Sequence, residues 1–329
     1  MPEALSLSGV AADLQGYAYD HKEHLVSRIA EIGLEGRPGT PIKALADYVN
    51  VMECDGIQSI VLTDLDTVDP LQPGNKDEFN PKAYGTLKNR TMTSRPIKVD
   101  MKYSQSQIHK LYSTYMMKVR MKRFDPKVVP FEEWVMVRLA EDIQKNLRIA
   151  FYNSIYDADG TDSGDIMDGV LDQITDIIAA APTTTNAVAL GSALTLATVR
   201  AKFDILKAAL PAKVRYGADT VMILNTAAYD LYCQAYQKEV TASPYNTEFG
   251  KTFLEGTQVE MIVEPGVEAF ARPIIATKDN LAMMLDFNRL AEFEFYYNKE
   301  TRAISVMLDF YGNAGIANPK DLWIGGFTA

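Results

Sequence analysis

The chain has 329 residues, of which 47% are hydrophobic and 23% charged, and its formal net charge is -10. This composition is typical of a folded globular protein and excludes a disordered or fibrous chain. The first twenty residues lack a basic leader followed by an apolar run, and no run of eighteen apolar residues occurs anywhere, so we expect neither an export signal nor a membrane span.

The first third of the chain is expected to contribute little core. Residues 1–50 mix short apolar clusters with Gly and Pro, and we expect one short helix at 21–36 in a region with thin packing. β-prone segments follow at 58–65 and 95–103, separated by the polar segment 69–91. A segment with so few large apolar side chains cannot build a core alone, so we predict a long hairpin-like excursion that needs a surface to lie on.

Two helices are predicted next. Residues 104–119 form one, capped by Ser104 or Ser106, and Asp125-Pro126 follows as a break. The second begins after Pro130 and is the strongest helical pattern in the chain, because an apolar residue recurs every four positions. These apolar residues are Phe131, Val135, Leu139, Ile143, Leu147, Phe151 and Ile155. The spacing predicts one amphipathic helix of roughly 25 residues, nearly 40 Å long.

The second half of the chain predicts an α/β unit followed by strands. The expected elements are a helix at 165–181, a polar loop at 182–191, a helix at 194–211, a strand at 220–225, and a helix at 226–239 capped by Asn225 or Thr226. The tail is mostly β, with strands at 258–265, 273–279 and 282–287 and a hairpin formed by 292–297 and 302–311.

Positive charge is concentrated in one part of this acidic chain. Residues 82–127 hold twelve Lys or Arg against two Asp, whereas the remainder holds 21 basic and 41 acidic residues. A nucleic-acid-binding module normally has a basic balance over its whole domain, because nearby carboxylates repel phosphates. A basic stretch on an acidic body is instead self-complementary between copies. A solvated face without a partner and nucleic-acid binding through residues 82–127 are the alternative interpretations.

No pattern for catalysis or metal binding is complete. Cys54 and Cys233 lack metal-ligand or disulfide spacing and indicate a reducing compartment. FGKT, residues 249–252, resembles the end of a phosphate-binding loop, but its first glycine is replaced by Tyr245. The acidic run 157–168 has its glycine at the wrong position for a calcium loop. The histidines, His21, His24 and His109, do not form a ligand set. We therefore expect no enzyme, no cofactor and no metal.

Six segments, in order, resemble the major capsid proteins of tailed bacteriophages, whose Hong Kong 97-type fold is also used by encapsulin shells. They are 95–112, 129–160, 196–236, 252–267, 274–287 and 304–326. The resemblance implies an α+β fold with an N-terminal arm, an extended β-hairpin loop, a long spine helix, a peripheral domain and an axial domain. The implied boundaries are 1–50 for the arm, 51–104 for the extended loop, 105–160 for the spine helix and peripheral domain, 161–285 for the axial domain and 286–329 for peripheral return strands.

The resemblance also implies a function. It implies a structural, non-enzymatic protein that assembles into hexamers and pentamers of an icosahedral shell around double-stranded DNA. The alternative it leaves open is an encapsulin-like compartment that encloses a cargo enzyme. Implied partners are other copies of the chain, a separate scaffolding protein, a portal and decoration proteins. The DNA is enclosed without sequence-specific binding and no membrane is involved. The implied location is the virion, after synthesis in the host bacterial cytoplasm.

The basic segment gives the candidate interface residues. In this family the loop and the approach to the spine helix overlap neighbouring subunits, so the resemblance implies that the basic side chains contact another copy. The candidates are Lys88, Arg90, Arg95, Lys98, Lys118, Arg120, Lys122 and Arg123. Some family members also join a loop lysine to a neighbour's asparagine, for which Lys88 with Asn313 or Asn318 is one pairing among many equally suitable ones.

Overall fold

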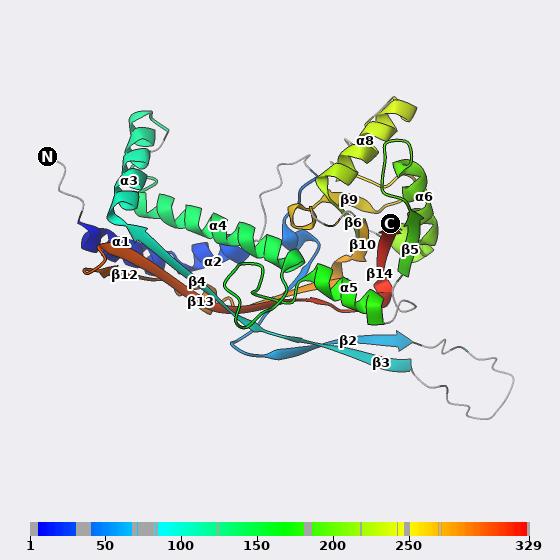
Figure 1. Ribbon diagram of the computed structural model, residues 1–329, viewed down its shortest axis with the longest axis horizontal. Coiled ribbons are helices and arrows are strands. Elements are labelled where there is room, and N and C mark those ends of the chain that lie inside the picture. Colours follow the sequence, from blue (N-terminus) through cyan, green and yellow to red (C-terminus); the bar gives the residue numbers. More distant parts are fainter. Residues whose placement is uncertain are drawn as a thin grey trace.

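The computed structural model contains two five-stranded sheets linked by one long helix, with a two-stranded hairpin projecting from one side (Figure 1). It describes residues 6–30, 41–67, 71, 82, 85–123, 125–180, 186–217, 219–241, 243–246, 251–268, 270 and 272–327. The fold is α+β, as the sequence predicted.

The first sheet is organised around its longest strand, β13. Its strands are β1 (Asn50–Glu53), β4 (Arg95–Ser104), β11 (Leu281–Leu285), β12 (Glu294–Asn298) and β13 (Ala303–Ile316). β13 pairs antiparallel with β4, β11 and β12, and the predicted closing hairpin is confirmed as β12 and β13. Helices of this part are α1 (Leu7–Asp20), α2 (Lys22–Ala30), α3 (Gln105–Arg120), α4 (Phe131–Asn153) and α5 (Val170–Ala180).

The N-terminal region is more ordered than we expected. Two helices, α1 and α2, lie within residues 1–50, and their buried apolar side chains join the same core as the long helix α4. The Ser6 side chain caps α1, because its Oγ accepts a hydrogen bond from the Gly9 amide at 3.1 Å. Leu14 and Leu25 are almost fully buried. The helix predicted at 21–36 is confirmed as α2, whereas α1 was not predicted and the expectation of thin packing is wrong for residues 7–30.

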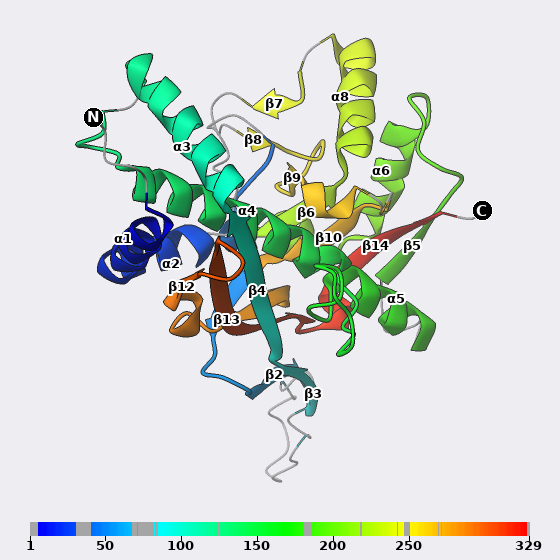
Figure 2. The same cartoon turned by 60° about the vertical axis from the view of Figure 1, so that its left-hand side comes forward.

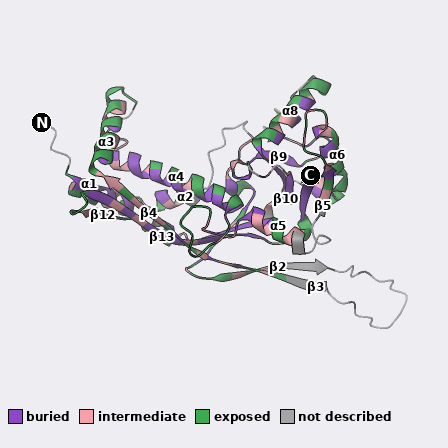
Figure 3. Cartoon of the chain, in the orientation of Figure 1, coloured by how far each residue is buried: buried purple, intermediate pink, exposed green. Residues whose placement is uncertain are grey.

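Helix α4 confirms the periodicity read from the sequence. Every predicted stripe residue from Phe131 to Phe151 is buried, while Ile155 lies beyond the end of the helix and is 60% exposed. Trp134, Met136 and Tyr152 are buried as well. The burial therefore extends beyond one stripe, because α1, α2 and the first sheet cover different sides of the helix (Figure 3).

The second sheet has the order β5-β14-β10-β6-β9. Its strands are β5 (Asn186–Gly191), β6 (Thr220–Leu224), β9 (Glu260–Val263), β10 (Ile274–Thr277) and β14 (Leu322–Phe327), with α6 (Val199–Ala209), α7 (Ala212–Arg215) and α8 (Thr226–Val240) beside them. Alternate residues of the central strands face opposite cores: Ile223 packs in the core shared with α4, and Met222 packs with α6 and α8. Both faces are thus buried, and the predicted α/β unit is confirmed.

Two predictions fail in this sheet. Part of the expected polar loop at 182–191 is strand β5, which pairs parallel with β14. Strand β14 lies between β5 and β10 in the second sheet, so the expectation that residues 286–329 all return to the first part of the protein is wrong for β14. Conversely, β11, expected in the axial part, pairs with β13 in the first sheet. These pairings are long-range and leave no local sequence signal.

The remaining elements are short, apart from the hairpin. Strands β2 (Ser59–Thr67) and β3 (Gly85–Thr93) pair antiparallel over their full length and project from the first sheet (Figure 2). This confirms the predicted excursion, although β3 falls largely in the segment that we expected to lack a strand. The other elements are β7 (Tyr245–Asn246), β8 (Lys251–Thr252), and the 3-10 turns η1 (Leu45–Asp47), η2 (Pro265–Val267), η3 (Lys278–Asn280), η4 (Arg289–Ala291) and η5 (Pro319–Asp321).

Candidate assembly surfaces

Hydrogen bonds through Ser94 close the base of the hairpin and tie it to Gly56, in the segment between β1 and β2. The Ser94 amide donates to the Gln58 carbonyl at 2.9 Å, and the Gln58 amide donates to Ser94 Oγ at 2.9 Å. Ser94 Oγ in turn donates to the Gly56 carbonyl at 2.8 Å. Gly56 adopts φ +65°, which favours glycine. These bonds therefore hold together the two chain segments from which the hairpin strands leave the body.

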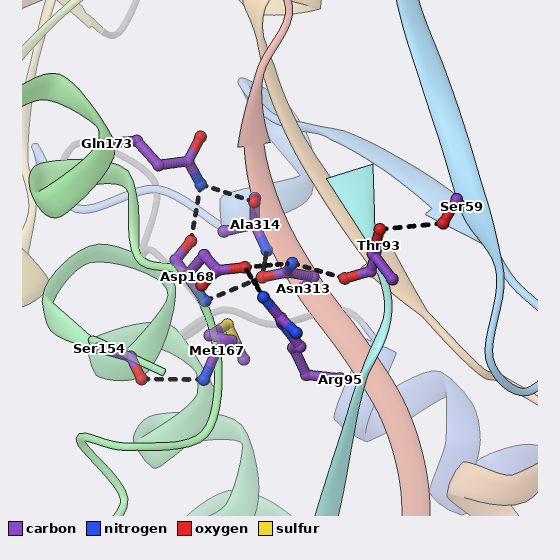
Figure 4. A network of polar contacts seen from close by, with 9 residues as sticks. All are labelled: Ser59, Thr93, Arg95, Ser154, Met167, Asp168, Gln173, Asn313 and Ala314. Atoms are coloured by element: carbon purple, nitrogen blue, oxygen red, sulfur yellow. Dashed lines mark hydrogen bonds and ion pairs between the residues drawn. The ribbon is translucent and has the colours of Figure 1, made fainter. Parts of the chain in front are cut away.

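A polar network holds the start of β4 against β13 and the loop after α4 (Figure 4). Asn313 is buried; its Nδ2 donates to the Thr93 carbonyl at 2.7 Å and to Asp168 Oδ2 at 2.9 Å. The Asp168 amide donates to Asn313 Oδ1 at 2.9 Å. Arg95 lies 3.3 Å from Asp168 Oδ2 and 4.0 Å from the centre of the Tyr156 ring. Arg95 and Asn313 are thus both engaged in contacts within the chain.

Helix α3 projects from the body beside the start of α4 (Figure 1). The Ser104 amide donates to Gln107 Oε1 at 2.8 Å, so the predicted cap at Ser104 is confirmed. Aromatic contacts hold the helix to α4: the Tyr115 ring lies 5.6 Å from Phe131 and 6.0 Å from Trp134. The Tyr115 hydroxyl also donates to the Val129 carbonyl at 2.8 Å. The end of α3 is therefore held in a defined position.

The structure separates the predicted interface residues into three places. Lys88 and Arg90 lie on the hairpin strand β3, Arg95 and Lys98 on β4, and Lys118, Arg120, Lys122 and Arg123 at the end of α3. The hairpin and α3 extend from different parts of the body in both views (Figures 1 and 2). The basic segment is continuous in sequence but does not form one patch.

Exposure differs among these residues. Arg120, Lys122 and Arg123 are exposed. Lys98 is exposed too, and its Nζ lies 3.2 Å from Asp100. The Lys118 Nζ lies 5.0 Å from the centre of the Trp134 ring. The side chain of Lys88 lies outside the described residues.

Arg90, like Arg95 and Lys118, is half-buried. One of its terminal nitrogens, Nη1, is buried without a hydrogen-bond partner among the described residues. Burial lowers the pKa of the Arg90 guanidinium from its ordinary value. A buried donor without a partner is costly in an isolated chain.

A buried charged cluster, which no local sequence pattern predicts, joins α4 to the end of β9 in the second sheet. The Arg148 Nε donates to Glu264 Oε1 at 2.8 Å and its Nη2 donates to Oε2 at 2.7 Å, with side chains only 3% and 0% exposed. Tyr48 donates to the same carboxylate, and Tyr152 donates to Tyr48. Burial opposes a charged Arg148, but the hydrogen bonds and charge of Glu264 raise its pKa overall. Burial raises the pKa of both tyrosines.

Within the described ranges, no group of three or more His, Cys, Asp or Glu side chains is arranged to hold a metal ion. The acidic run after α4 forms a turn in which the Asp159 amide donates to Asp157 Oδ1 at 3.0 Å. Residues 249–250 of the FGKT motif lie outside the described residues. No helix in the described part of the chain is long and apolar enough to span a membrane.

The fold is similar to that of phage capsid structures. A chain of the satellite phage P4 procapsid, in a structure that includes the size determination protein, matches with a TM-score of 0.53 and 12% identity over 87% of this chain and 96% of that chain. A chain of the capsid of an empty GTA particle matches with a TM-score of 0.50 and 14% identity over 88% of this chain and 92% of that one. No family model and no curated protein matches the sequence. The chain has the fold of phage capsid proteins.

Proposed function

We propose that this chain is the structural major capsid protein of a tailed phage and assembles with copies of itself into a closed shell. The observation that carries the proposal is the capsid-protein fold over 87% of the chain. The finer parts of the proposal are hexamers and pentamers, an icosahedral shell of the Hong Kong 97 type, and division into peripheral and axial domains. Location in the virion follows from this role, after synthesis in the bacterial cytoplasm.

The hairpin supports assembly because it is poorly suited to an isolated subunit. A two-stranded hairpin in water is marginally stable unless its side chains pack on another surface. Val61 is 50% exposed on β2. A neighbouring copy that lies along the hairpin supplies an apolar surface to cover this side chain.

The charge distribution supports contacts between copies, and it supports enclosure of DNA without tight binding to the shell. The exposed basic residues Arg120, Lys122 and Arg123 have acidic surfaces available on other copies, since the chain carries a net charge of -10. The acidic remainder repels phosphate, so we propose that DNA is enclosed without sequence-specific binding. A separate scaffolding protein, a portal and decoration proteins are the further proposed partners. No catalysis is proposed.

Particle size, shape and contents test the proposal. We expect the purified chain, alone or with a candidate scaffolding protein, to form rings or closed particles in negative-stain micrographs and by light scattering. Particles from infected cells should protect DNA from nuclease. Protected protein cargo without DNA would instead indicate an encapsulin-like compartment. A monomer of 36.5 kDa in every condition, scaffold included, contradicts the shell function.

A further inference from the structure

A groove with a volume of about 710 Å³ lies between β4, α4 and the acidic loop that follows α4. Its lining includes the partly buried apolar residues Val99, Met101 and Ile166 and the buried Ile143 and Phe310. Six carboxylates also line it: Asp100, Asp142, Asp157, Asp162, Asp165 and Asp309. The groove therefore combines apolar surface with a strong excess of negative charge.

Few cations within the groove offset this charge. The two basic side chains in its lining are Lys98 and Arg289. Lys98 already pairs with Asp100 at 3.2 Å, and Arg289 lies 3.7 Å from the buried Asp286. An occupant that matches the groove must present apolar side chains together with several positive charges.

The end of α3 has this composition. We call residues 117–123 and 125–128 the α3 tip. Its exposed apolar side chains are Met117, Met121 and Val128, at 51%, 56% and 70% exposure. Its exposed basic residues are Arg120, Lys122, Arg123 and Lys127, against a single acid, Asp125. Exposed methionine and valine beside positive charge mark a surface for binding rather than a solvated face.

The tip is already ordered in the isolated chain. The Arg123 amide donates to the Lys118 carbonyl at 3.0 Å, and Lys122 adopts φ +55°, which ends the helix in a left-handed turn. The Val129 amide donates to the Asp125 carbonyl at 2.9 Å. Because this backbone is held in place, docking costs little conformational entropy. Helix α3 also projects away from β4 and from the loop after α4 of its own chain (Figures 1 and 2).

We propose that the α3 tip of one copy docks in the acidic groove of the next copy. The proposal rests on the shell function proposed above and names one of its contacts. Tip and groove are different surfaces, so the contact is head-to-tail and repeats from copy to copy. Such a contact closes into a ring when the rotation per copy divides a full turn, as capsomers require. Opposite charges at its edge speed encounter and fix its register.

Reciprocal charge reversal tests the pairing. The tip variant carries Arg120→Glu, Lys122→Glu and Arg123→Glu, and the groove variant carries Asp142→Lys, Asp162→Lys and Asp309→Lys; all six residues are exposed. Each variant should reduce association, measured by sedimentation at low salt, by about tenfold or more, because attractive pairs become repulsive. The variant with all six changes should restore association to within about threefold of the wild type. A control with Lys213→Glu, Lys238→Glu and Lys299→Glu has the tip variant's net charge and should assemble normally.

A disulfide trap locates the contact directly. Met121→Cys and Ala158→Cys place one thiol on the tip and one on the groove lining. Under mild oxidation this pair should crosslink copies, whereas each single variant should not. The pair Thr91→Cys and Ala158→Cys tests whether the hairpin, rather than the α3 tip, occupies the groove of the neighbouring copy.

The outcomes separate this contact from the shell function. Restored assembly together with the Met121–Ala158 crosslink supports the docking. Wild-type shells with no restoration by the six-residue variant overturn the docking and leave the shell function intact. A crosslink from position 91 but not from 121 also overturns it, in favour of the hairpin. A wild-type chain that never associates overturns both.

Discussion

Removing the positive partner of the buried ion pair should strongly destabilise the subunit. Arg148→Met leaves the Glu264 carboxylate fully buried, with the Tyr48 hydroxyl and the Gly266 amide as its remaining donors among the described residues. Breaking a buried pair from one side costs about 3–5 kcal/mol, because an uncompensated charge stays in a low dielectric. The expected loss in the free energy of unfolding is therefore about 3–5 kcal/mol.

Urea denaturation of the unassembled subunit in high salt, followed by circular dichroism, measures this loss. With a slope of about 3 kcal/mol per molar urea, the midpoint should fall by about 1–1.7 M. The matched control is Arg138→Met, which changes an exposed arginine on the same helix and should shift stability by less than about 0.5 kcal/mol.

A double variant tests the reason as well as the size of the effect. Glu264→Gln removes the charge but keeps an acceptor for the Tyr48 hydroxyl. Combining it with Arg148→Met should cost less than the sum of the single changes, because no lone buried charge remains. Two results would refute the argument that a lone buried Glu264 charge destabilises the variant. They are additive losses of the two single changes, and a loss below about 1 kcal/mol for Arg148→Met.

Three further changes probe the core, the hairpin base and a buried thiol. Ile143→Asp should prevent folding, because it buries an unpaired charge. The control Lys145→Asp, on the exposed side of α4, should still fold. A soluble Ile143→Asp subunit with an unchanged Tm would show that this helix face is not core. Ser94→Ala should speed amide exchange in β2 and β3 with little loss of global stability; unchanged exchange rates count against Ser94 as the anchor. Burial raises the pKa of Cys54 to about 11 from its ordinary value of 9.0, so the folded state holds the proton more tightly than the unfolded state. The stability of the wild type should then fall as pH rises from about 9 to about 11. The difference between the urea midpoints of the wild type and of Cys54→Ala should therefore narrow over that pH range. A difference that stays constant contradicts this prediction.

The order of elements was largely readable from the sequence. The apolar spacing along α4, the cap at Asn225 and the alternation in β12 and β13 are local patterns, and each appears in the structure. The signal for α1 was also present: Leu7, Val10, Leu14 and Ala18 recur with a helical period, but small residues between them weakened the pattern.

The candidate interface was less predictable than the fold. The excess of positive charge in residues 82–127 could be counted from the sequence. The distribution of these residues over three separate places in the fold could not be predicted from it. Arg95 faces Asp168 across 73 residues of sequence, and Arg90 is half-buried at the hairpin, whereas Arg120 is exposed. Exposure depends on which distant segments come close, so residues of one charge run have different surroundings.

The sequence by itself determined the helices, the hairpins and the electrostatic division of the chain, because periodicity, caps and charge are properties of neighbouring residues. Only the tertiary structure decided that β14 enters the second sheet, that Arg148 meets Glu264, and that carboxylates from β4, α4, β13 and the loop after α4 line one groove. The physical reason is that these contacts join residues far apart in the chain, and long-range pairing follows from the burial of whole faces rather than from any local preference.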